Sequence, residues 1–488
     1  MAGAIRGEGT AVEQRPEDFA PEPPSRNLPP MPYKDMPEPL SLGKILGPSV
    51  ILAGLGVGSG EYILWPFIAS NAGLGAIYMA FIGVTLQYFL NMEIERWTLA
   101  TGETAVVGFA RFWKPWGIIF CFFVTVPNMW PGWATAGATT FTYIFGGTPS
   151  TIAIICLIAI GIALTTSPVV YQTLEKAQFF KVSLTIVFLV IAVIAAIQPS
   201  DWGDLVSDGI GGIGSLPTES VPVATLLAAL VFAGAGGANN LVQSNWIRDK
   251  GFGMGEYIPK IVSPITGEPE AAPSTGNMVR QDPENIDRFN RWFKVANKEQ
   301  FFTFWVICIA SITVFSVLAY STIFGENLSE EPNFDFIEAE GNALKEIVAP
   351  WFGTFFWAFG TLSLVLVALG VVDYVARLTA DVISTLYVHD RHWWSESKIY
   401  FAIVWMMVTI GTVVLLSGLD QPLVLLVLAA CLNGMVMFVY SILLIILNRK
   451  ALPEAIKVRG LRLGVLFVCV FFYGFFSSWY VIEQIGTL

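Results

Sequence analysis

Two glycine-rich stretches decide the fold of this chain, and they read Gly54-Leu55-Gly56-Val57-Gly58-Ser59-Gly60-Glu61 and Gly234-Ala235-Gly236-Gly237-Ala238-Asn239-Asn240. Each stretch interrupts an apolar segment that is long enough to cross a lipid bilayer. Glycine is a poor helix former, and a helix break at membrane depth is tolerated where it is buried in protein or lines a cavity. A pair of such breaks, one in each half of a chain, is the pattern that indicates the substrate site of a transporter.

The composition is that of a protein with many membrane spans. Only 13% of the 488 residues are charged, about half the share found in soluble proteins. Apolar runs of about 20 residues recur, and each can cross the roughly 30 Å of bilayer hydrocarbon. We therefore predict an all-α integral membrane protein that sits in a lipid bilayer. The predicted spans are 47–69, 74–95, 117–145, 150–168, 177–197, 222–246, 300–324, 351–386, 399–417, 422–447 and 461–485.

The basic residues support this number of spans. With eleven spans, all of the 27 lysines and arginines except Lys345 fall on one side of the membrane. Loops on the cytoplasmic side carry the excess of basic residues. We therefore expect a cytoplasmic N-terminus and a C-terminus outside. Because motifs of nucleophilic and metal-dependent enzymes are missing from the sequence, it predicts no enzyme, no cofactor and no nucleic-acid partner.

The positions of the breaks predict the domain organisation. They fall in the first and sixth spans, so spans one to five and six to ten form two five-helix repeats, the second inverted relative to the first. The predicted divisions are a disordered cytoplasmic tail (1–42, proline-rich), the first repeat (43–198), an outer loop (199–221), the second repeat (222–450) and the eleventh span (451–488). The second repeat contains a cytoplasmic loop (248–298) and an acidic outer loop (325–350).

Polar residues at the two breaks are the candidate site. Glu61 lies halfway through the first span, where an ionisable group indicates a functional site. As a carboxylate it would bind a hard cation or carry a proton, although it could instead cap the second half of the broken helix. After the second break, Asn239, Asn240 and Gln243 offer amide ligands. The candidate substrate-binding residues are Gly58, Ser59, Gly60, Glu61, Gly236, Gly237, Asn239, Asn240 and Gln243, and the candidate metal ligands are Glu61 and Asn239.

Three further groups have a structural interpretation. Asp373, Arg377 and Asp381 are four residues apart in the eighth span, a spacing that favours an ion ladder along one helix. The five cysteines lie in apolar spans without the spacing of a metal site, which indicates ordinary packing. The two histidines, His389 and His392, share one polar loop, where solvation is a simpler interpretation than metal binding.

Several motifs resemble the Nramp family of divalent-metal transporters. The stretch Gly47-Pro48-Ser49 before the first break resembles that family's opening, and Leu86-Gln87-Tyr88 and Thr101-Gly102-Glu103 resemble its second span. Asn240-Leu241 after the second break also matches. The resemblance covers residues 40–450. It implies the LeuT fold, with five plus five inverted spans, broken first and sixth spans and a cytoplasmic N-terminus.

The chain departs from the family at the residues that carry its chemistry. Where the family's first break has aspartate-proline-glycine-asparagine, this chain has Gly58-Ser59-Gly60-Glu61. Where the second break has methionine-proline-histidine, this chain has Gly237-Ala238-Asn239. The stretch 126–133 in the third span has none of the family's acidic residues, and the ninth span lacks its basic pair. The methionine sulfur that helps to select transition metals is therefore replaced.

These departures leave two substrate hypotheses. Glu61, amides and carbonyls form a hard oxygen ligand set that suits magnesium ahead of manganese or iron, carried by alternating access without the family's proton coupling. Alternatively, the Gly-Ser-Gly run resembles that of amino-acid transporters with this fold, in which unwound amides bind a carboxylate. A small organic solute would then be the substrate, and Glu61 would face its ammonium group or hold a proton.

Overall fold

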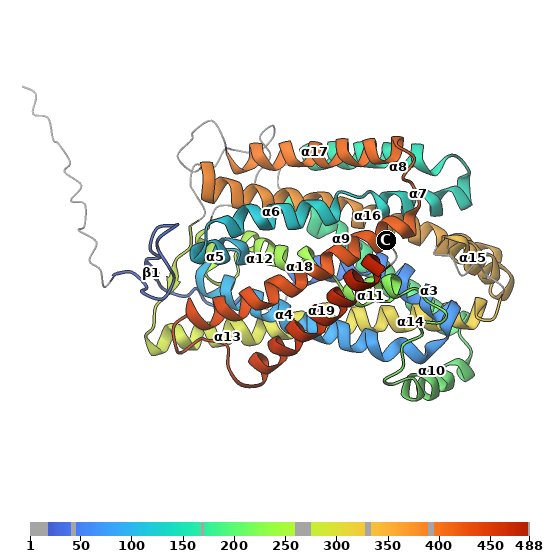
Figure 1. The fold of residues 1–488 in the computed structure, drawn as a ribbon, viewed down its shortest axis with the longest axis horizontal. Coiled ribbons are helices and arrows are strands. Elements are labelled where there is room, and N and C mark those ends of the chain that lie inside the picture. The colour runs from blue at the N-terminus through green and yellow to red at the C-terminus, as the bar shows by residue number, and fades with distance from the viewer. Residues whose placement is uncertain are drawn as a thin grey trace, which may run out of the picture.

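The computed structural model describes residues 18–40, 45–166, 170–258, 275–326, 333–388 and 395–486, and they form a helical bundle (Figure 1). Within these ranges ten helical segments are long and apolar enough to cross a membrane. The divided pair α11 (Val223–Val231) and α12 (Ala238–Lys250) forms the sixth predicted span, and neither half alone is long enough to be included among those ten.

Both predicted breaks are present. The first span consists of α2 (Pro48–Gly56), the π-helical turn η2 (Ser59–Leu64) and α3 (Trp65–Ala72), with the break between α2 and η2. In the sixth span, residues 232–237 separate α11 from α12. Three glycines of this break, Gly234, Gly236 and Gly237, have φ angles of 95°, 70° and 65°. A side chain disfavours this left-handed region, which explains why the turn is made of glycine.

The remaining spans of the first half follow the prediction, with one difference in the third. These spans are α4 (Ile77–Thr101), α6 (Pro115–Asn128) with α7 (Gly132–Phe145), α8 (Pro149–Thr166) and α9 (Val170–Ala195). We expected a continuous helix over 117–145, but it is interrupted between Asn128 and Gly132. Pro131 stands at the start of α7, and because proline has no backbone N–H it is tolerated at the start of a helix rather than in its interior.

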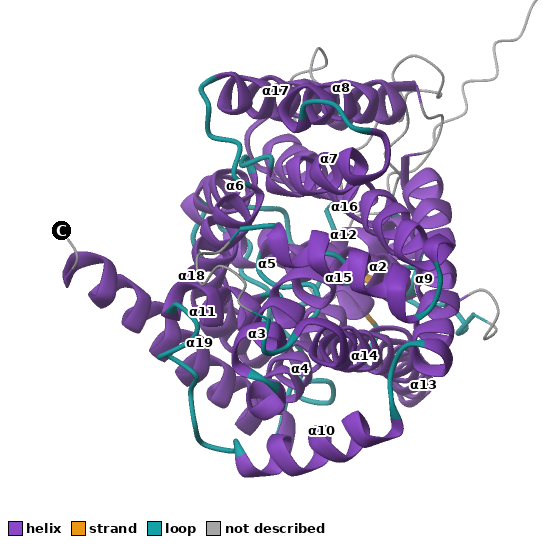
Figure 2. Cartoon of the chain, turned by 90° about the vertical axis from the view of Figure 1, so that its right-hand side faces the viewer, coloured by secondary structure: helices purple, strands orange, loops and turns teal. Residues whose placement is uncertain are grey.

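The second half continues with five long helical spans. They are α13 (Pro283–Gln300) continued through η5 (Phe301–Trp305) into α14 (Val306–Ile323), α16 (Pro350–Ile383) continued by η6 (Ser384–Val388), α17 (Glu396–Leu416), α18 (Pro422–Lys450) and α19 (Gly460–Gly486). The seventh span was predicted to start at residue 300, but the helix begins at Pro283 because Asp282 caps it through the Asn285 amide at 3.0 Å. Figure 2 shows α8 beside α17 at one edge of the bundle, and α19 at another.

Segments that were predicted as loops contain shorter helices. α10 (Pro199–Gly211) lies in the predicted outer loop and α15 (Asp335–Ile347) in the acidic loop, at the end of the bundle opposite β1 (Figure 1). At the other end, α5 (Ala105–Phe112) follows α4, η4 (Gly253–Tyr257) follows α12, and β1 (Tyr33–Lys34) pairs in parallel with β2 (Met278–Val279). We call this second end the strand end. The predicted histidine loop lies outside the described residues.

Residues 18–40 differ from the predicted disordered tail, because they pack across the strand end. Met31 and Met36 are fully buried. The Asn285 side chain accepts a hydrogen bond from the Met36 amide at 2.6 Å, and the Trp292 indole donates to the Pro37 carbonyl at 2.8 Å. Arg111 of α5 donates to the Pro29 carbonyl at 2.9 Å. A proline-rich segment has few amides for a helix of its own, but its free carbonyls accept hydrogen bonds from neighbouring donors.

We expect Trp292→Phe to loosen this segment. Phenylalanine keeps most of the packing of Trp292, which is 1% exposed, but removes the donor to Pro37. The loss of one buried hydrogen bond costs about 1 kcal/mol. The melting temperature of the detergent-solubilised protein should therefore fall, and trypsin should cleave faster at Lys34. The matched control is Trp113→Phe, at a site 51% exposed. Equal behaviour of the two variants would contradict the proposed contact.

Candidate functional site

The two breaks cross each other in direct contact. A Cβ atom added to Gly60 would lie 1.7 Å from the carbonyl oxygen of Phe232, in the break of the sixth span. A Cβ atom added to Gly56 would lie 2.9 Å from the carbonyl oxygen of Gly234 and 3.2 Å from a carboxylate oxygen of Glu61. Backbone therefore packs on backbone here, and glycine is required for the close approach rather than for its own dihedral angles.

This contact makes Gly60→Ala a sharp test of the packing. The added methyl group overlaps the Phe232 carbonyl, so the two breaks must move apart. Overpacking in a tight core costs about 1–3 kcal/mol, and this overlap is with backbone, which cannot rotate away. We expect a lower melting temperature and loss of transport. The control is Gly203→Ala, where an added Cβ meets open space. A normally stable and active Gly60→Ala protein would contradict this geometry.

Gln87 of α4 satisfies the open peptide groups of the second break. Its side-chain amide donates to the Val231 carbonyl at 2.8 Å, and its side-chain oxygen accepts from the Gly236 amide at 2.8 Å. Asn433 of α18 accepts from the Ala238 amide at 3.0 Å, at the start of α12. Gln87 belongs to one of the motifs that resemble the Nramp family, but the sequence does not indicate that this side chain bridges the break.

Gln87→Leu should destabilise the protein more than the loss of one ordinary side chain. The change leaves one carbonyl and one amide buried without partners, at a cost of about 1–3 kcal/mol each. We expect a clear fall in melting temperature, measured by intrinsic fluorescence. Gln421→Leu provides the comparison, because Gln421 precedes α18 on the surface and its side chain makes no capping hydrogen bond. A fall that is no larger for Gln87→Leu would refute the bridging role.

Two other helices hold the first break. The Ser363 hydroxyl of α16 donates to the Val57 carbonyl at 2.8 Å, and the Lys181 ammonium of α9 donates to the Gly54 carbonyl at 2.5 Å. The count of basic residues places Lys181 on the cytoplasmic side with the others, but it lies inside α9 and is buried. The signal that could have found it is a lysine between apolar residues, in the stretch Phe179-Phe180-Lys181-Val182.

Glu61 is fully buried beside this lysine. Neither of its carboxylate oxygens has a hydrogen-bond partner among the described residues. The charge of Lys181 acts on it, and the thiol of Cys308 and the amide of Gly234 lie around it. An unpartnered carboxylate in hydrocarbon is costly, and the attraction of Lys181 offsets part of that cost. Glu61 and Lys181 are thus neighbouring ionisable groups at the crossing of the breaks.

The side-chain amides that were predicted as ligands lie on α12, which directly follows the second break. Asn240 donates to Asn91 at 2.5 Å and Gln243 donates to Gln300 at 2.8 Å, while Asn239 makes a long bond to the Ala235 carbonyl at 3.4 Å. The side-chain oxygens of all three have no partner among the described residues. In the same ranges no group of three or more His, Cys, Asp and Glu side chains is placed to hold a metal ion. The pair Glu61 and Asn239 as metal ligands therefore stays a prediction.

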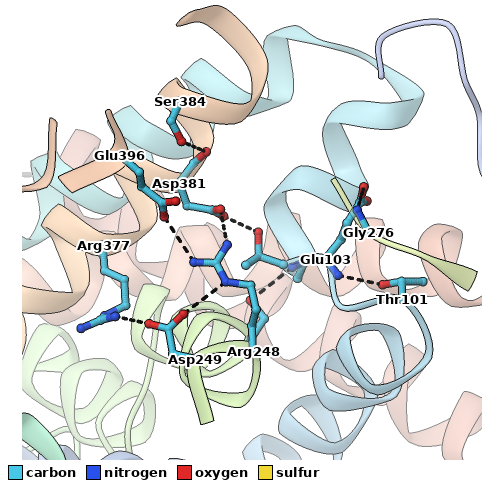
Figure 3. Close-up of polar contacts among 12 residues, drawn as sticks. Thr101, Glu103, Arg248, Asp249, Gly276, Arg377, Asp381, Ser384 and Glu396 are labelled. Atoms are coloured by element: carbon cyan, nitrogen blue, oxygen red, sulfur yellow. Dashed lines mark hydrogen bonds and ion pairs between the residues drawn. The ribbon is translucent and has the colours of Figure 1, made fainter. Parts of the chain in front are cut away.

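The predicted ion ladder is part of a larger network between helices (Figure 3). Arg377 binds Asp373 within α16 at 2.8 Å, as expected, and also pairs with Asp249 of α12. Asp381 pairs with Arg248 of α12, and Arg248 also reaches Asp249 and Glu396 at 3.3 Å. The network therefore ties the end of the broken sixth span to α16 and α17 at the strand end, which the spacing within one helix did not indicate.

Comparison with known proteins identifies the fold. No protein-family model and no curated protein sequence matches the chain. Among solved structures, the manganese transporter of Eremococcus coleocola, in complex with an aromatic bis-isothiourea substituted compound, is similar with a TM-score of 0.65 at 12% identity, over 92% of this chain and 89% of that one. The nucleobase-cation-symport-1 family transporter Mhp1 in a closed conformation has a TM-score of 0.55 at 11% identity, over 91% and 94%.

A third similar structure is MhsT in complex with L-phenylalanine, with a TM-score of 0.51 at 12% identity, over 91% of this chain and 99% of that one. At such identities the likeness concerns the fold alone. These transporters share the LeuT fold, and the prediction of that fold is confirmed. The chain is an all-α membrane protein of the LeuT fold, with its first and sixth spans broken where they cross.

Proposed function

We propose that this protein is a secondary transporter that carries a small organic solute past the crossing of its two broken helices. The observation that supports transport is the arrangement of the breaks, which cross in mid-bundle with their peptide groups held by Gln87 and Ser363. In this mechanism spans one, two, six and seven rock against the others, so that the site opens to each side in turn. The strand end faces the cytoplasm, as the basic residues predict.

Lys181 is the observation that favours an organic solute over a divalent cation. Its ammonium group lies on the Gly54 carbonyl, beside the only carboxylate within the first break. A positive charge on Lys181 would repel a divalent cation, and it attracts Glu61 instead. The amides of Ser59 and Gly60 in the first turn of η2 could bind a negatively charged group of a solute, because the first amides of a helix lack partners within it.

Divalent-cation transport, with magnesium favoured, is the second candidate. The oxygens without partners on Glu61, Asn239, Asn240 and Gln243 are hard ligands of the kind that magnesium prefers. One of the transporters of similar fold, from Eremococcus coleocola, is named as a manganese transporter. For this chain, however, a cation site would need Lys181 to move away from the Gly54 carbonyl. The two hypotheses therefore make opposite predictions for removal of the lysine charge.

Uptake into proteoliposomes by Lys181→Met and Glu61→Gln variants separates the candidates. For an organic solute, screened as labelled amino acids and nucleobases, we expect saturable uptake by wild type and about tenfold or greater loss in both variants, since each leaves a buried charge unpaired. Magnesium and manganese uptake should stay at the level of empty vesicles. The matched controls are Lys176→Met, exposed on the same helix, and Glu219→Gln, exposed in a loop.

The opposite result would favour the second candidate. Saturable magnesium uptake that Glu61→Gln abolishes and Lys181→Met increases would reject the organic-solute proposal, because it would show that the lysine competes with the cation. Variants are compared only after size-exclusion chromatography shows a folded, monodisperse protein.

A further inference from the structure

A file of buried polar side chains extends from the second break toward the strand end. On α4, Gln87, Asn91 and Glu95 are spaced four residues apart, which places them on one face of the helix. The file begins at Gln87, which holds the Gly236 amide, and passes to Asn91 through its bond with Asn240 of α12. The break, and with it the surroundings of Glu61, is therefore continuous with the α4 face.

The part of this file nearer the strand end lies where α2, α12 and the seventh span meet. Gln243 of α12 donates to Gln300 at 2.8 Å, and the Ser49 hydroxyl of α2 bonds to both Gln300 and Glu299. Asn91 bonds to Asn240, and Glu95 and Gln243 follow these two residues about one turn later on α4 and α12, where the charge of Glu299 acts on Glu95. Four helices thus converge on two carboxyl groups.

These side chains carry many polar atoms without partners. Both oxygens of Glu95, which is 0% exposed, and one oxygen of Glu299 have no hydrogen-bond partner among the described residues. The same is true of one side-chain atom each of Gln243 and Gln300 and of both amide atoms of Asn245. Each unpartnered buried group costs about 1–3 kcal/mol, so a dry file of this kind is unstable. Ordered water commonly supplies the missing partners of buried polar groups of this kind.

The neighbouring cations do not neutralise the two carboxyl groups directly. The positive charge of Arg462 on α19 attracts Glu95, but its guanidinium group binds Glu93 at 3.3 Å and Asn297 at 2.5 Å. The positive charge of Lys250 attracts Glu299, but its ammonium group binds Glu175 at 2.5 Å. Of the other charged and titratable groups nearby, Arg96 binds Glu93 at 2.6 Å, and Tyr171 of α9 faces Glu299.

We propose that Glu95 and Glu299 form a proton path between the strand end and the crossing of the breaks. Two neighbouring buried carboxyl groups that no cation binds directly cannot both stay ionised, and binding of a proton neutralises one of them. A proton enters from water at the strand end, binds a carboxylate oxygen of Glu299 or Glu95, and passes toward Glu61 along water molecules that the amide side chains hold by hydrogen bonds. Each step moves one proton between oxygen atoms, with no change in oxidation state.

This inference rests on the proposed transport function, and it adds the ion that drives it. Binding of a proton at Glu61 would weaken its attraction to Lys181 and release the lysine from the first break. The path differs from the third and ninth spans, whose acidic and basic residues the sequence analysis found to be missing. The described geometry therefore gives the chain its own route for proton coupling.

The test measures protons in two ways, with Glu95→Gln and Glu299→Gln beside wild type. Infrared spectroscopy of the purified protein reports the carbonyl stretch of protonated carboxyl groups, and we expect each variant to lose part of that band. Proton flux into proteoliposomes, driven by a potassium diffusion potential and read with an enclosed pH dye, should fall about tenfold or more in each. Glu219→Gln, at an exposed site, should behave as wild type.

The two readouts separate this inference from the transport proposal. Wild-type proton flux and an unchanged infrared band in both variants would overturn the proton path, even if solute uptake proceeds. Loss of the band and flux in the variants would support the path, even if no solute in the screen is carried. Because glutamine has the shape of a protonated glutamate, we expect unchanged melting temperatures. A large fall in both variants would instead show that the carboxyl groups are ionised and would also overturn the proposal.

Discussion

Peptide groups that leave a helix within the membrane must find new hydrogen-bond partners, and the architecture of this protein depends on how its two breaks find theirs. Gln87, Asn433 and Ser363 come from three other spans and supply donors and acceptors to the open backbone. The breaks also press on each other through Gly60 and the Phe232 carbonyl. Neither broken span would be stable without the helices around it.

Buried charge is the second feature that organises the bundle. At the crossing of the breaks, Lys181 attracts Glu61, and at the strand end Arg248 and Arg377 bind the carboxylates of three helices. Such pairs are costly to desolvate and more costly to separate. A movement that separates α12 from α16 and α17 at the strand end must therefore break the ion pairs of the network in Figure 3.

The sequence predicted most of the spans and both breaks correctly, because hydrophobic runs and glycine clusters are local signals. It missed the short helices α10 and α15 and the interruption before Pro131, since amphipathic surface segments and prolines near a helix end have weaker patterns. The proline-rich residues 18–40 were predicted as disordered on composition. Their order comes from donors on α5 and α13, which composition cannot reveal.

The sequence by itself determined that the chain crosses the membrane many times, that its first and sixth spans are broken, and that Glu61 lies at a break. These are properties of short stretches and of the high cost of polar backbone in lipid. Only the tertiary structure decided which side chains meet there. Lys181 lies 120 residues from Glu61 along the chain, and Glu95 and Glu299 lie further apart still. Pairing between distant segments depends on how helices pack, which no local pattern records.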